Sequence, residues 1–223
     1  MELSLIIRQI AIIALPILVA IVMHEVSHGF IANKLGDPTA RTMGRLTLNP
    51  IAHIDLFGTI LMPILLFIFT NGQFVFGYAK PVPINPYNFK NPKRDMAISA
   101  AGGPAINILL AVISALTLKY FFMPLASSLS DNTFAISVIQ PLTLMLTASI
   151  KINSVLAVFN MIPIPPLDGG RVLMGFLPYK QAEILSRIEP YGMIIVILLI
   201  ITNITGYIIF PIIKLFINLL NML

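Results

Sequence analysis

Long apolar stretches separated by charged loops constrain this chain more than any other feature of its sequence. A membrane-spanning helix needs about 20 predominantly apolar residues, and four stretches reach that length. Only 10% of the residues are charged, whereas a soluble domain has about 25%. We therefore expect an all-α polytopic membrane protein with a bundle of about four to six transmembrane helices. In chain order the five apolar stretches are Leu5–Ala32, the marginal Leu56–Thr70, Met96–Leu118, Phe134–Ile162 and Met193–Leu223.

The basic residues predict how the chain is oriented. Segments 33–55, 71–95 and 167–190 hold ten of the fourteen Lys and Arg residues, and such loops are retained on the cytoplasmic side. This pattern favours a multi-pass protein of the cell membrane over a protein that binds nucleic acid, although the net charge is +5. Because two of these segments flank Leu56–Thr70, we interpret that stretch as a re-entrant element, with a short true crossing as the alternative.

Two loop segments, 40–55 and 73–89, look extended. In the second, Phe74, Phe76 and Tyr78 alternate with smaller residues, which is the period of a β-strand. The prolines that follow exclude a regular helix or a central strand. We therefore expect short membrane-associated β-strands beside the helices.

The remaining sequence indicates one domain. We find no internal repeat and no linker, so residues 1–223 are expected to form a single integral-membrane domain. The last apolar stretch is too long for one straight crossing, and Gly206 and Pro211 are expected to break it, leaving an interfacial or folded-back tail. The N-terminus lacks a basic region, so we expect no cleaved signal peptide.

The strongest chemical signal is the sequence His24-Glu25-Val26-Ser27-His28. On a helix, positions i and i+4 lie on one face, so both imidazoles can reach one metal ion. Glu25 lies beside them and can act as a general base. Such groups are costly within an apolar helix unless they pair or function. The alternative is a hydrogen-bonded polar cluster within the bundle.

Zinc requires a third protein ligand and an open fourth position. The chain has no cysteine, so this ligand must be another histidine or a carboxylate. Asp168 is the better candidate, because the predicted topology brings the turn after the fourth apolar stretch to the same side as His24 and His28. His53 is more typical of a loop histidine. The alternative for Asp168 is a helix-capping role.

Four motifs together resemble the site-2 protease family of intramembrane zinc metalloproteases, in its short prokaryotic form without PDZ or CBS domains. They are HEVSHG from His24, GRLTLNP at 44–50, GGPAIN at 102–107 and FNMIPIPPLDGGR at 159–171. The resemblance covers about residues 8–190. It implies that Asp168 is the third ligand of one Zn²⁺ per chain. It also implies that Asn107 helps to hold the substrate or the oxyanion and that the active site faces the cytoplasm.

The expected activity is hydrolysis of peptide bonds in or near transmembrane segments of membrane proteins, with a zinc-activated water and Glu25 as base. The partners would be a transmembrane protein or peptide substrate and the lipid bilayer. Two other hypotheses remain: a transporter that conducts ions through the His/Glu cluster, and an inactive scaffold. A stripe of small residues at four-residue steps, Ser99, Gly103, Asn107, Ala111 and Ala115, is interpreted as helix packing, with Asn107 as the functional exception.

Overall fold

The fold is a set of helices, seen here in a computed structural model that describes residues 3–69, 77–129, 133, 135–202 and 204–222. Every regular element among these residues is helical, including the 3-10 helices η1 and η3 and the π-helices η2, η4 and η5. In chain order they are α1 Leu3–Lys34, α2 Thr39–Thr42, η1 Pro50–His53, η2 Leu56–Leu61, α3 Met62–Phe69, η3 Pro86–Asn88, α4 Pro92–Thr117, η4 Leu118–Phe122, α5 Met123–Ser128, η5 Ala135–Ile139, α6 Gln140–Asn160, α7 Asp168–Phe176, α8 Tyr179–Ser186, α9 Glu189–Ile201 and α10 Ile204–Met222.

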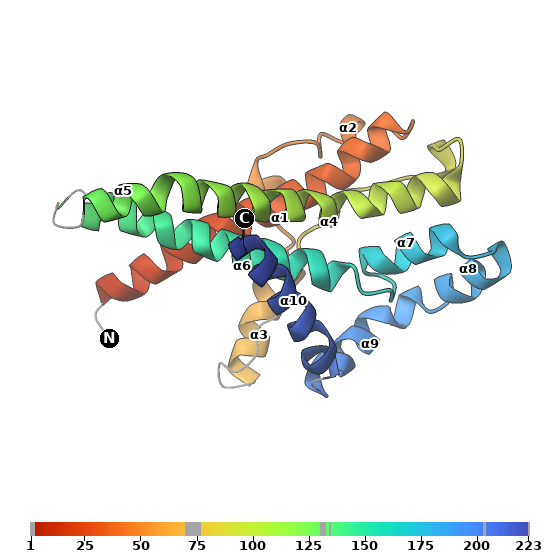
Figure 1. Cartoon of the computed structure of the whole chain (residues 1–223). Coiled ribbons are helices and arrows are strands. Elements are labelled where there is room, and N and C mark those ends of the chain that lie inside the picture. The colour runs from red at the N-terminus through yellow and green to blue at the C-terminus, as the bar shows by residue number, and fades with distance from the viewer. Residues whose placement is uncertain (1–2, 70–76, 130–132, 134, 203, 223) are drawn as a thin grey trace.

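The centre of the fold is a bundle of α1, α4 and α6, which pack against one another. Figure 1 shows α4 running antiparallel to the other two. Its buried face consists largely of small residues, among them Ser99, Gly103, Ala111 and Ala115. Small side chains let helix backbones approach closely, which is how helices associate in a membrane. The bundle therefore brings the middle of α4 directly against α1.

Three of the described helices are long and apolar enough to cross a membrane: Ile7–Lys34, Pro92–Ser128 and Ser137–Asn160. They correspond to the first, third and fourth stretches predicted from the sequence. Leu56–Phe69, Glu189–Leu199 and Gly206–Leu220 are shorter apolar helices. These helices confirm the prediction of an α-helical membrane protein. They do not confirm the predicted count of four to six crossing helices, because three of the described helices meet the length and hydropathy criteria.

The predicted β-strands are not confirmed, because the described residues contain none. The segment after residue 76 is extended but lacks a ladder: the N–H of Tyr78 donates to Gly58 O at 3.0 Å, and that of Lys80 to His53 O at 2.9 Å. The next N–H on the same edge, that of Val82, donates to the side chain of Glu25 instead of a main-chain carbonyl. Phe74 and Phe76, on which the prediction also depended, lie outside the described residues.

The C-terminal part folds back, but not at the predicted position. α10 runs through both Gly206 and Pro211. The chain instead changes direction between α9, which ends at Ile201, and α10, which begins at Ile204 (Figure 1). α10 then packs against α6 and α9. The tail thus covers one side of α6.

The ends of the bundle differ. α2, η3, α7 and α8 gather at the end where α1 and α6 finish and α4 begins, whereas α5 lies at the opposite end (Figure 1). The loops that carry most of the basic residues therefore share one end, as the charge pattern predicted. The second apolar stretch forms η2 and α3, and α3 projects away from the bundle. Thr70, the end of that stretch, lies outside the described residues.

Candidate metal centre

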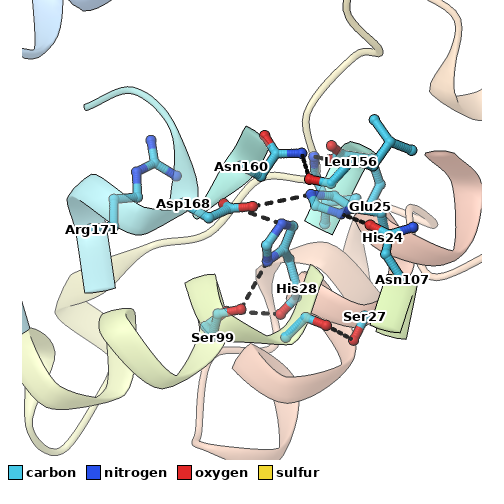
Figure 2. Close-up of polar contacts among 12 residues, drawn as sticks. His24, Glu25, Ser27, His28, Ser99, Asn107, Leu156, Asn160, Asp168 and Arg171 are labelled. Carbon is cyan, nitrogen blue, oxygen red and sulfur yellow. Dashed lines mark hydrogen bonds and ion pairs between the residues drawn. The ribbon is translucent and has the colours of Figure 1, made fainter. Parts of the chain in front are cut away.

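Two histidines project from one face of α1 toward α4. His24 and His28 are one helical turn apart, and their rings meet edge to face with centroids 4.7 Å apart. Both are buried. The i, i+4 spacing of the motif thus produces the predicted pair of imidazoles with their Nε2 atoms on the same side (Figure 2).

Asp168 completes the cluster from a distant part of the chain. The proline-rich turn after α6 ends the helix and directs the chain back, so α7 begins at Asp168 against the two imidazoles. Asp168 Oδ2 lies 3.1 Å from His24 Nε2, and Asp168 Oδ1 lies 3.3 Å from His28 Nε2. Leu167 occupies the N-cap position, and no side chain caps this helix. The carboxylate therefore faces the histidines instead of capping the helix.

These atoms fit a divalent cation. One ligand atom from each of His24, His28 and Asp168 lies within 4.8 Å of the others. The other ring nitrogen of His28, Nδ1, is 2.8 Å from the carbonyl of Ser99. A carbonyl only accepts hydrogen bonds, so Nδ1 must donate and the neutral ring presents a lone pair at Nε2. Asp168 Oδ2 is buried, and the polar atom that faces it is His24 Nε2 at 3.1 Å. Converging acceptors of this kind require a cation, and two imidazoles with one carboxylate form a known zinc ligand set.

The carboxylate of Asp168 is ionised at neutral pH. Burial raises the pKa of its carboxyl, but the hydrogen bonds and positive charges that His24 and His28 supply when they are protonated outweigh this and lower the pKa to about 2. A metal ligand must be deprotonated, and the ionised carboxylate meets that condition.

Gly103 provides the space beneath the imidazoles. A Cβ atom at this position would lie against the Nε2 atoms of both His24 and His28, far inside van der Waals contact. The backbone of α4 therefore passes directly under the atoms that would hold a metal. The adjacent turns add hydrogen bonds: Ser99 Oγ donates to His28 O at 2.9 Å, and Ser27 Oγ donates to Gly102 O at 2.9 Å.

Asn107 contacts His24 from the side opposite Asp168. Its Oδ1 lies 2.5 Å from His24 Nδ1, and its Nδ2 donates to Asn153 Oδ1 at 2.8 Å and to Ala20 O at 3.2 Å. It is fully buried and is not among the residues that line the cavity described next. This geometry favours a role in holding His24 over the predicted contact with substrate.

A cavity of about 330 Å³ lies beside the cluster. Glu25 lines it next to His24, and its Oε2 accepts a hydrogen bond of 2.9 Å from the main-chain N–H of Val82. Asn160 also lines the cavity. Its side-chain Nδ2 donates to Leu156 O at 3.0 Å, so the side-chain oxygen Oδ1 is left for another partner. The other lining residues are Tyr78, Ala79, Pro81, Ile84, Met96, Ala100, Pro166, Leu167, Arg171 and Met193.

The structure thus brings together His24, Glu25, His28 and Asp168, and it places Asn107 behind His24. His53 lies elsewhere, with Nε2 2.9 Å from Thr47 O. Sequence reasoning missed Ser99 and Gly103, which were assigned to packing. The sequence does contain a clue to both residues. The small residues of α4 recur every four positions, which is also the spacing of His24 and His28, the histidines that this face of α4 contacts.

Comparisons with known proteins give a consistent result. Residues 11–202 match the family model described as Peptidase family M50. A Bacillus subtilis protein named "Putative zinc metalloprotease YwhC" is 35% identical over 199 residues, which are 89% of this chain and 84% of that protein. Two proteins named "Putative zinc metalloprotease Rip2" are 26% identical over 185 residues (Mycolicibacterium smegmatis) and 28% identical over 182 residues (Mycobacterium tuberculosis). They align over 83% and 82% of this chain but only 64% and 63% of their own lengths. No solved structure gives a significant match.

Proposed function

The chain belongs to peptidase family M50, the site-2 protease family that its motifs resemble, and we propose that it cleaves peptide bonds in or near transmembrane segments of membrane proteins. It is a zinc metalloendopeptidase. Family membership makes the transporter hypothesis unnecessary, because the His/Glu cluster has its explanation in peptidase chemistry.

The observation that carries the proposal is the convergence of His24, His28 and Asp168 beside Glu25, with both histidines on a helix long enough to cross a membrane. The two imidazole Nε2 atoms and the Asp168 carboxylate would hold the zinc ion. Zinc in such a site lowers the pKa of water and polarises the carbonyl to be attacked.

Glu25 is the general base in this proposal. Its carboxylate lines the cavity one residue from His24, where it would accept the proton of the attacking water and deliver it to the leaving amine. The N–H of Val82 holds one carboxylate oxygen and so orients the group. The other oxygen is left to exchange protons with the reacting groups.

His24 and His28 need a fixed ring orientation for this chemistry, and α4 provides it. Ser99 O accepts from His28 Nδ1, and Asn107 Oδ1 faces His24 Nδ1. We assign Asn107 to this positioning role. Asn160, whose carbonyl oxygen is left free in the cavity, is the better placed amide to contact a bound peptide.

A substrate must be extended at the cavity, because a helix hides its carbonyls in its own hydrogen bonds. Residues 78–82 form an extended wall of the cavity in which the N–H groups of Tyr78, Lys80 and Val82 are already used within the protein. The opposite edge of this wall includes Ala79, which lines the cavity. An unwound peptide would pair with that edge through Ala79, and Pro81 and Pro83, which have no N–H, limit this pairing to a short stretch.

The protein is proposed to be one integral-membrane domain over residues 1–223 in the cell membrane. The basic loops gather at the end of the bundle where α7 lies, and α7 begins with Asp168, which lines the cavity. Loops of this kind remain cytoplasmic. The cavity would therefore receive water from the cytoplasm.

Two experiments test this function. Purified protein in detergent should contain about one zinc per chain, and His24→Ala should lose it, whereas Glu25→Gln should retain zinc. Cells with the wild-type chain should produce peptide termini inside transmembrane segments, and mass spectrometry should find none of them with Glu25→Gln. The same variant can trap substrates for identification.

An inactive scaffold predicts identical termini from the two strains. Termini confined to soluble regions would contradict the proposed intramembrane substrate class.

A further inference from the structure

The other interaction of Asn107 is its hydrogen bond to Asn153, a residue of α6 that no motif includes. Asn107 and Asn153 are 0% and 1% exposed, and they join the three helices of the bundle at the level of His24. Figure 2 shows Asn107 against His24. Buried polar side chains are costly unless their hydrogen bonds are satisfied, so the partners of this pair define its orientation.

A main-chain carbonyl determines which atom of the Asn153 amide donates and which accepts. Asn153 Nδ2 donates to Ser149 O at 2.9 Å. A carbonyl can only accept, so the amide nitrogen of Asn153 must face Ser149 and its Oδ1 must face Asn107. Asn153 Oδ1 then accepts from Asn107 Nδ2 at 2.8 Å.

The same reasoning fixes Asn107. Its Nδ2 also donates to a second main-chain carbonyl, Ala20 O, at 3.2 Å. If the Asn107 amide were reversed, its oxygen would face Asn153 Oδ1 and Ala20 O, and both contacts would become repulsive. Asn107 Oδ1 is therefore held toward His24 Nδ1, 2.5 Å away.

We propose that Asn153 is a positioning residue that sets the tautomer of the ligand His24 through Asn107. An oxygen facing Nδ1 requires the ring proton at Nδ1, which leaves the lone pair at Nε2 for the metal. The chain Ser149–Asn153–Asn107–His24 thus connects the backbone of α6 to the metal centre. This inference rests on the proposed role of His24 as a zinc ligand.

The test is the zinc affinity of purified protein in detergent, measured by competition with a chelator. Asn153→Leu, which keeps the size but removes the hydrogen bonds to Asn107 and Ser149, should weaken zinc binding by about 10- to 100-fold, the range found when partners of metal ligands are removed. Asn153→Asp always keeps an acceptor for the Asn107 amide and should lose less affinity than Asn153→Leu. Ser154→Ala is the matched control, because Ser154 is equally buried and its hydroxyl donates to Ile150 O of its own helix. It should bind zinc like the wild type.

A double variant separates positioning from general destabilisation. If Asn153 acts through Asn107, Asn107→Ala should weaken zinc binding similarly, and adding Asn153→Leu should cause little further loss. The chain has three histidines, so ¹⁵N spectra of the zinc-free protein can report the ring tautomers directly. In the wild type, His24 should carry its proton on Nδ1, and Asn153→Leu should reduce that population.

The outcomes are distinguishable. If His24→Ala binds zinc as well as the wild type, the proposed metal site fails and this inference fails with it. If His24→Ala loses zinc but Asn153→Leu behaves like Ser154→Ala, only the positioning role is overturned. Additive losses in the double variant, or an unchanged tautomer in Asn153→Leu, would also overturn it.

Discussion

The main-chain N–H of Val82 donates a hydrogen bond of 2.9 Å to Oε2 of Glu25, 57 residues away in sequence. The loop before α4 thereby orients the carboxylate assigned as general base. Val82→Pro removes this donor and should lower kcat by about tenfold. A general base contributes roughly 100- to 10,000-fold, and a carboxylate that has lost its orientation should lose only part of that contribution. The assay would use a membrane substrate trapped with Glu25→Gln.

Val82→Ala is the control for that variant, because it removes the side chain and keeps the N–H. It should retain most of the activity, and both variants should keep about one zinc per chain. Equal activity in Val82→Pro and the wild type would show that this hydrogen bond does not orient Glu25.

Gly103 should tolerate no side chain. A methyl group there would occupy the space next to both Nε2 atoms, so Gly103→Ala should lower zinc affinity by about 100-fold, at the upper end of effects on supporting residues. The adjacent Gly102→Ala would place its methyl against the end of the Ile31 side chain, which can move, and should keep its zinc. Equal zinc affinity in the two variants would contradict the assigned geometry. Affinity can be measured by chelator competition.

Asp37 should make stability depend on pH. It is fully buried and accepts hydrogen bonds from Asn88 Nδ2 and Asn85 N, both at 2.7 Å, and from Thr39. Burial raises the pKa of its carboxyl, but these hydrogen bonds, that of the Thr39 side chain first, lower it below its usual range. Because the pKa is lower in the folded state, the stabilisation is present above the ordinary pKa of about 3.9 and is lost as pH falls through the lower, folded-state pKa.

Thermal unfolding of Asp37→Asn in detergent measures this effect. The variant should be less stable than the wild type by about 1.5–3 kcal/mol at pH 7, the range for hydrogen bonds to a charged group. The difference should shrink below about pH 4. A difference that stays constant down to pH 3 would contradict the assignment to the ionised carboxylate.

The orientation in the membrane can be tested cleanly because the chain has no cysteine. Single cysteines at the exposed positions Lys90 and Lys180 should react with an impermeant thiol reagent only from the cytoplasmic side. A cysteine at the exposed Ser128, at the opposite end of the bundle, should react only from outside. The reverse labelling pattern would contradict the proposed position of the active site.

The metal cluster could be predicted from sequence because helix periodicity relates the two histidines and the membrane topology places Asp168. His24 and His28 need only a helix to share a face. Asp168 required the further argument that the turn after the fourth stretch returns to the same side. Both expectations agree with the distances in the structure.

Other features escaped prediction for physical reasons. The contacts of Asn107 and Asn153 depend on how α4 and α6 rotate about their axes, and the apolar pattern of a membrane helix does not specify that rotation. The hydrogen bond from Val82 comes from a backbone group, which every residue except proline possesses and which therefore leaves no pattern in sequence. Pro211 was expected to end a helix, yet membrane helices accommodate proline when neighbouring groups satisfy the backbone.

The central claim is that His24, His28 and Asp168 together hold one zinc ion. Anomalous diffraction at the zinc absorption edge, from crystals of the zinc-loaded protein, tests it most directly. The account predicts one strong peak about 2.0–2.2 Å from Nε2 of both histidines and from a carboxylate oxygen of Asp168. A peak at another set of residues, or none between these three side chains in protein shown to contain zinc, would contradict it.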